Sequence, residues 1–198
     1  ISGYAGGLSA WKFLVLPVII GLSVFSTYYS FVKIGEGDRR YSLENISKTA
    51  QITAYDIRFQ TGRDAGSGYT LGELDGSFNS MIRLAPQAIN VSLFRPYLWE
   101  ITNPLMLLSA IESLVFLVLT LFLIFKFRFS LARAFRNPDV IFSIVFSLVF
   151  AFAVGVSSFN FGTLARYKIP LMPFYAIALI LIFYENKAKK VEEFETTE

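Results

Sequence analysis

The sequence predicts an all-α membrane protein with four transmembrane helices and a mostly helical outer loop region. The first observation is four apolar stretches of about 21 or 22 residues, each long enough as a helix to cross a hydrocarbon core roughly 30 Å thick. The second is composition: 54% of the residues are hydrophobic and only 17% are charged, whereas a soluble domain carries about 25% charged residues. A helix also satisfies the hydrogen bonds of its own backbone, and this is required in lipid because no water is available there to do so.

The expected domains follow from these stretches. Residues 1–31 hold an N-terminal segment and the first span, Trp11–Phe31. Residues 32–103 form an extracytoplasmic loop region with helices near 41–60 and 77–92. Residues 104–184 hold the other spans, at Pro104–Phe125, Pro138–Phe159 and Leu164–Tyr184, and residues 185–198 form a cytoplasmic tail with a disordered acidic end.

Local signals place the ends of these elements. Ser42 is the expected N-cap of the first outer helix, and residues 77–92 predict an amphipathic helix on the outer membrane surface, bent at Pro86. Asn103 and Asn137 each precede a proline, which predicts a capped helix start. The glycine-rich segment 62–76 predicts a loop, either a plain connector or a lid over an outer site.

Basic residues set the expected orientation. Four of them lie between the second and third spans, and three lysines follow the fourth span. The positive-inside rule therefore predicts that both termini are cytoplasmic.

The residue inventory excludes several kinds of chemistry. The chain has no cysteine and no histidine, which excludes disulfides, thiolate nucleophiles, Cys/His zinc sites and histidine bases. The spacing of the outer acidic residues fits no familiar metal loop. We expect no metal, no cofactor and no nucleic-acid partner, and we expect contact with membrane lipids.

Glu112 is the candidate catalytic residue, because a carboxylate inside a span is costly and is paired, functional or both. Two interpretations stay open: an ion pair with a cation of another span, or a group that handles protons or polar substrate in an outward-facing cavity. Arg166 and Lys168 offer the partner. They also offer a site for a bound anion, with snorkelling to lipid headgroups as the alternative.

Three other features concern the same outer end. Arg95 and Glu100 pair with each other or face that cavity, and solvated rim charges are the favoured interpretation. Pro170 predicts an opened first turn in the fourth span. A stripe of small residues in the third span predicts close helix packing, with a conduction path as the weaker alternative; its members are Ser143, Ser147, Ala151 and Gly155.

Two stretches resemble known families. Residues 66–114 resemble uncharacterised bacterial polytopic membrane proteins linked to surface-polysaccharide production. The stretch NFGTLARYKIPLMPF, residues 160–174, resembles the Arg-Tyr-x-x-Pro-x-x-Pro helix entry of GT-C-type, polyprenyl-phosphate-dependent glycosyltransferases. The resemblance implies a bacterial inner-membrane location and the C-terminal part of a larger protein. It implies binding of a polyprenyl-phosphate-linked glycan by Arg166 and Tyr167, with Lys168 and Arg95 as further candidates.

Three functions follow. The first is an enzyme of envelope polysaccharide or lipid-linked glycan assembly, either a glycosyltransferase or a polymerase. The second is a non-catalytic structural subunit bound to other membrane subunits. The third is a transporter fragment, against which the missing internal repeat and the single buried acid argue.

Overall fold

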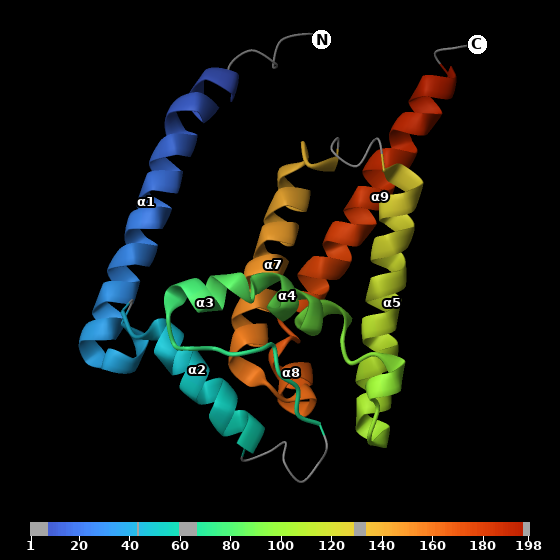
Figure 1. Ribbon diagram of the computed structural model, residues 1–198. Coiled ribbons are helices and arrows are strands. Elements are labelled where there is room, and N and C mark those ends of the chain that lie inside the picture. The colour runs from blue at the N-terminus through green and yellow to red at the C-terminus, as the bar shows by residue number, and fades with distance from the viewer. Residues whose placement is uncertain (1–7, 43, 60–66, 129–133, 196–198) are drawn as a thin grey trace. The chain divides into compact units, whose positions relative to one another are not determined.

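The computed structural model describes residues 8–42, 44–59, 67–128 and 134–195. Within these ranges the regular structure is helical, and one isolated bridge joins Gly68 to Asn160. Figure 1 shows the elements in chain order. They are α1 (Leu8–Gly37), η1 (Arg39–Tyr41), α2 (Ile46–Ile57), α3 (Phe78–Arg83), α4 (Ala85–Phe94), η3 (Leu98–Glu100), α5 (Pro104–Phe127), α7 (Pro138–Ser158), α8 (Phe161–Tyr167) and α9 (Leu171–Glu195).

The chain forms two compact units, Ile1–Thr49 and Ala50–Glu198. The first consists mainly of α1, whose 30 residues extend the predicted first span at both ends. Asp38 caps η1 and forms an ion pair with Arg40. Large apolar side chains of α1 are exposed, among them Leu22, Phe25 and Tyr29.

The second unit contains two helices that are long and apolar enough to cross a membrane, α5 and α7. Both have a mean hydropathy of 2.5 over their most apolar window. Their starts confirm the two predicted caps, because the Asn103 side chain accepts a hydrogen bond from the Met106 amide and the Asn137 side chain accepts one from the Asp139 amide. The membrane character of the chain and the bounds of these two spans agree with the sequence.

The predicted fourth span is not one continuous helix. α8 and α9 meet at a break of three residues and are bent by 68°. Pro170 occupies the break, and it has no backbone N–H to continue a helix. The described residues therefore provide two candidate spans, or three when α8 and α9 count as one bent span. α9 also continues to Glu195, so the tail is helical well beyond the predicted end at Tyr184.

The outer region differs from its prediction in two places. Ser42 ends η1 and does not cap α2, which begins at Ile46. The helix predicted at 77–92 is divided at Leu84 into α3 and α4. Pro86 falls in the first turn of α4, where a missing N–H costs nothing.

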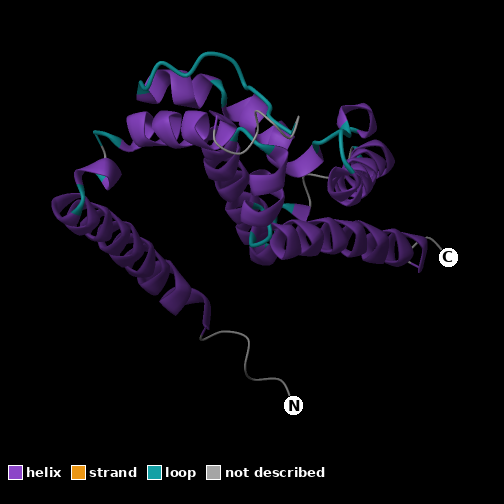
Figure 2. Cartoon of the chain, turned by 90° about the horizontal axis from the view of Figure 1, so that it is seen from below, coloured by secondary structure: helices purple, strands orange, loops and turns teal. Residues whose placement is uncertain are grey.

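α4 packs against another helix of the chain. It crosses α7 in Figure 1, and residues of the two helices are in contact. Figure 2, coloured by secondary structure, draws helices and loops for the described residues. Ala88, Val91 and Ser92 are buried, and the Ser92 hydroxyl donates to the Ala151 carbonyl at 2.7 Å. The buried apolar residues of α4 therefore face α7 of the same chain, whereas Phe78 and Ile82 of α3 are exposed. Contact of this region with the membrane surface stays a prediction.

The small residues of α7 explain this contact. Ser143, Ser147, Ala151 and Gly155 are all buried, which confirms the prediction of close packing. A Cβ added at Gly155 would lie 2.3 Å from the Ala88 carbonyl oxygen. The backbones of α4 and α7 therefore meet where only a hydrogen atom fits.

We predict that Gly155→Ala lowers the free energy of unfolding by about 1–3 kcal/mol, the usual cost of overpacking a core. The matched control is Gly21→Ala in α1, where an added Cβ meets nothing within 4 Å. A mid-helix Gly→Ala exchange at such an open position is neutral or stabilising. Thermal unfolding of both variants in one detergent compares them, and equal stability of the two would contradict the packing explanation.

Candidate functional site

The site is built around the buried ammonium group of Lys168, at the break between α8 and α9. Only 2% of the Lys168 side chain is exposed. Nζ lies 2.9 Å from Oε1 of Glu112 on α5 and donates a hydrogen bond of 3.1 Å to the Ser113 hydroxyl. The structure thus brings Glu112 and Lys168 together as the predicted ion pair.

Glu112 is less enclosed than its partner. Its side chain is 34% exposed. Oε1 is buried and contacts Lys168 as an ion pair, without a hydrogen bond of good geometry to any described residue. The pair therefore joins a fully buried cation to a carboxylate that reaches the protein surface.

Ser113 connects this pair to the segment before α5. Its hydroxyl accepts from Lys168 and donates to the Arg95 carbonyl at 3.0 Å. Sequence reasoning did not select Ser113. The available signal was its position one residue after Glu112, on the face of α5 that also carries Ser109 and Thr120.

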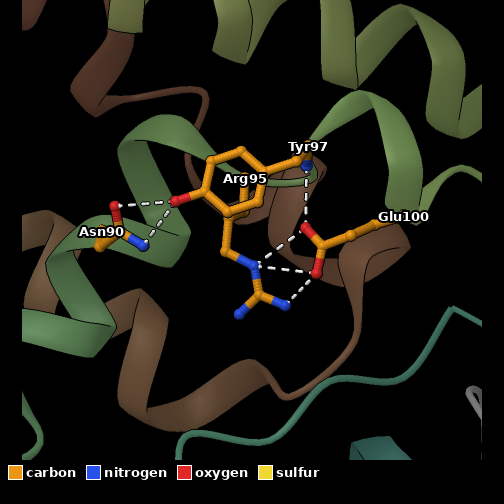
Figure 3. Close-up of polar contacts among 4 residues, drawn as sticks. All are labelled: Asn90, Arg95, Tyr97 and Glu100. Atoms are coloured by element: carbon orange, nitrogen blue, oxygen red, sulfur yellow. Dashed lines mark hydrogen bonds and ion pairs between the residues drawn. The ribbon is translucent and has the colours of Figure 1, made fainter.

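Arg95 and Glu100 form a second ion pair, shown in Figure 3. Both Glu100 oxygens accept from the Arg95 guanidinium, and one also accepts from the Tyr97 amide at 2.8 Å. The Tyr97 hydroxyl contacts Asn90 at 3.1 Å. About four fifths of each charged side chain is buried, so these are not the solvated rim charges that were favoured from the sequence.

Aromatic rings surround the Arg95 guanidinium. Its central carbon lies 5.3 Å from the Phe161 ring centroid and 5.8 Å from those of Tyr69 and Tyr97, within cation–π range. The hydrogen bonds to Glu100 raise the pKa of Arg95 against the effect of its partial burial. Desolvation pushes the pKa of Glu100 upward, but its hydrogen bonds with Arg95 and Tyr97 outweigh burial, so this pKa lies below its ordinary value.

The described part of the predicted glycine-rich loop, residues 67–76, packs into the core through Tyr69, Leu71 and Leu74. The Tyr69 amide donates to the Phe159 carbonyl, and the Phe161 amide donates to the Ser67 carbonyl. The Tyr69 hydroxyl meets the Ser158 hydroxyl at 2.9 Å, and burial raises the pKa of Tyr69 strongly. These contacts hold residues 67–69 against the turn between α7 and α8. Residues 62–66 of the predicted loop lie outside the described residues.

A pocket of about 280 Å³ lies between the start of α5 and α8. Arg166 lines it, together with polar and apolar side chains of several segments. The other lining residues are Ser67, Asn103, Leu105, Met106, Ser109, Phe161, Gly162 and Ala165. Arg166 is exposed and has no hydrogen bond or ion pair with any described residue. The pocket thus presents a cation that is available to a ligand.

The five predicted site residues fall in three places. Glu112 and Lys168 form the buried pair, and Arg95 touches it through Ser113. Arg166 lines the pocket. Tyr167 is 51% exposed on α8 and is not among the pocket-lining residues. Ser67, Asn103 and Ser109, which also line the pocket, were not selected from the sequence as site residues. Asn103 was identified only as a helix cap, and a single serine in a loop or in an apolar span does not indicate a binding site.

The comparisons with known proteins add no assignment: no protein-family model, curated protein or solved structure matches the chain. Among the described residues, no group of three or more acidic side chains lies close enough together to hold a metal ion.

We predict unequal losses when the Glu112–Lys168 pair is broken from either side. Glu112→Gln leaves a buried ammonium group without its counter-charge and lowers the free energy of unfolding by about 3–5 kcal/mol. Lys168→Met leaves a carboxylate that already reaches the surface, so its loss is smaller. The double variant regains part of the loss of Glu112→Gln, because it removes the buried charge.

The control is Lys33→Met, which breaks the exposed Lys33–Glu36 pair. Such surface pairs contribute only about 0–1 kcal/mol. Thermal unfolding in mild detergent compares the four variants with the parent. Equal losses for the two single variants would contradict the predicted asymmetry of the pair. Strictly additive losses in the double variant would show that Lys168 does not depend on Glu112.

Proposed function

We propose that this chain is an integral membrane protein of envelope polysaccharide or lipid-linked glycan assembly. In this proposal the pocket between α5 and α8 holds the phosphate of a polyprenyl-phosphate-linked glycan. The observation that carries it is Arg166, a cation without a partner among the described residues, which lines a pocket beside helices long and apolar enough to span a membrane. A guanidinium binds phosphate oxygens through a planar fork of donors.

The resemblance in residues 160–174 supports the same site. This stretch forms α8, the break and the first turn of α9. Its arginine, Arg166, lines the pocket, and Tyr167 follows it on the exposed side of α8. Leu105 at the pocket and Ile169 beside the break are exposed apolar side chains that suit an isoprenoid tail.

Glu112 is the catalytic candidate within this proposal. It lies three residues beyond Ser109 on α5, hence on the next turn of the same helical face, and Ser109 lines the pocket. Lys168 orients its carboxylate from the protein side, and the exposed part of the side chain is free for a substrate. Lys168 and Arg95 then support the site from within and do not bind phosphate, because their charges are already paired.

The proposed topology has four crossings in a bacterial inner membrane: α1, α5, α7 and the bent pair α8–α9. Both termini are cytoplasmic. Support comes from the basic residues between α5 and α7 and after α9, and from the length and apolar character of α1.

Single cysteines test this topology, because the chain has none of its own. Glu73→Cys and Arg136→Cys replace exposed side chains at opposite ends of the second unit. In intact cells, a membrane-impermeant maleimide is expected to label Glu73→Cys at once and Arg136→Cys only after lysis. Labelling in the reverse order would exclude this orientation.

We predict that Arg166→Gln reduces surface polysaccharide in the producing cell at an unchanged level of the chain. Losing one charge-assisted hydrogen-bonding group costs about 1.5–3 kcal/mol, hence about 10–100-fold in binding. Arg83→Gln is the matched control, because Arg83 is exposed on α3 and is not among the pocket-lining residues. Normal polysaccharide in the Arg166 variant would contradict the proposal.

The second candidate is a non-catalytic subunit of a larger membrane complex. The exposed apolar side chains of α1 favour it, because they suit a helical partner as well as lipid. Purification in mild detergent separates the candidates: a stable, stoichiometric partner together with normal polysaccharide in the Arg166 variant supports the subunit. A chain that purifies alone opposes it.

A further inference from the structure

We propose that the pocket between α5 and α8 selects a singly charged phosphodiester that carries one small hydroxylated group. The inference rests on the proposed function, because it names the class of phosphate that this site accepts. A pocket of this kind binds a phosphodiester in preference to a pyrophosphate, because a pyrophosphate carries at least one more negative charge.

The cations near the pocket differ in whether they already have a counter-charge. Lys168 faces Glu112, and Arg95 faces Glu100, so each of these cations already has its counter-charge. Arg166 has none among the described residues, and the pocket-lining residues include no acidic side chain. The lining therefore presents one unit of positive charge. One negative charge on the ligand is matched by this cation, and a second would have no counter-charge among the pocket-lining residues.

The start of α5 adds little to this charge. A helix N-terminus attracts anions through its free N–H groups. Here Pro104 has no N–H, and the Met106 amide already donates to both the backbone and the side chain of Asn103. The Asn103 side chain thus occupies the place that a second phosphate group would need.

The polar lining and the size define the rest of the ligand. Ser109 has a hydroxyl with no hydrogen bond to any described residue, and the Asn103 amide nitrogen likewise has none. Both can pair with ligand hydroxyls. A volume of about 280 Å³ is just below the range of roughly 300–1,000 Å³ typical of sites for drug-sized ligands. A phosphate and one sugar-sized or glycerol-sized group fill this space, and an oligosaccharide does not.

The rim of the pocket favours a lipid-borne phosphate over a soluble one. Leu105 lines the pocket while 85% of its surface is exposed. α5 belongs to the membrane-spanning part of the chain, so an apolar tail attached to the phosphate can lie along this side chain. Two membrane sources share the chemistry, a polyprenyl phosphate hexose and a phospholipid with a glycerol headgroup.

Native mass spectrometry of the purified chain in detergent tests the selection. The probes are a polyprenyl phosphate hexose, phosphatidylglycerol, a polyprenyl pyrophosphate and soluble glycerophosphoglycerol, a phosphodiester without an apolar tail. The variants are Arg166→Gln, Ser109→Ala and the control Arg83→Gln. We expect at least one lipid phosphodiester to bind about tenfold or more tightly than the pyrophosphate, which corresponds to the cost of one poorly matched charge.

The variants locate the binding. Arg166→Gln is expected to weaken binding of the phosphodiester about 10–100-fold. Ser109→Ala is expected to weaken it about fivefold, which corresponds to the loss of one neutral hydrogen bond. Arg83→Gln is expected to change nothing. The tighter of the two lipid phosphodiesters identifies the source, and competition by glycerophosphoglycerol at equal concentration would overturn the assignment to a lipid.

Failure of this inference is distinguishable from failure of the proposed function. Tightest binding of the pyrophosphate, still dependent on Arg166, overturns the charge selection and leaves the lipid-phosphate function standing. Binding of no anionic lipid, or equal effects of the Arg166 and Arg83 variants, overturns both.

Discussion

The arrangement of the second unit depends on one buried cation. Lys168 lies at the break between α8 and α9, inside the protein, and it is tolerated there because Glu112 and Ser113 of α5 face it. An isolated ammonium group in such surroundings would cost several kcal/mol. Because the pair joins α5 to the start of α9, it also fixes where α8 lies beside α5. The pocket between those two helices exists only in that position.

A second constraint is the close approach of α4 and α7. The absence of a side chain at Gly155 brings the backbones together, and the Ser92 hydroxyl satisfies a carbonyl at the same contact. α4 in turn leads directly into Arg95, whose carbonyl oxygen accepts from Ser113. The contact between α4 and α7 is therefore linked to the two ion pairs through Arg95 and Ser113.

The sequence predicts the elements better than their partners. Asn103 and Asn137 indicate helix starts because capping is a local interaction, and the apolar spans are evident from length alone. The helix at 77–92 was assigned to the membrane surface because its periodicity shows that one side is apolar but not what covers it. The same limit applies to Arg95 and Glu100, whose burial arises from rings of distant segments, Tyr69 and Phe161.

The candidate site shows this limit most clearly. Glu112 could be selected from sequence because a charge within an apolar stretch needs a partner, and Lys168 was one of two named candidates. The choice between Lys168 and Arg166 could not be made in advance. They lie two positions apart, and at the end of α8 one points into the protein while the other is exposed. Pro170 indicates that the helix breaks there, but which of the two side chains is buried depends on tertiary contacts.

The bend between α8 and α9 has a consequence for the surrounding lipid. The apolar part of α9, residues 171–184, rises about 21 Å at 1.5 Å per residue, which is shorter than a hydrocarbon core of roughly 30 Å. α8, with seven residues, turns away by 68° and does not extend that length along the same axis. A bilayer around this helix meets hydrophobic mismatch on one side of the chain and is expected to thin there. Such thinning would bring headgroups and water closer to the polar residues of the pocket.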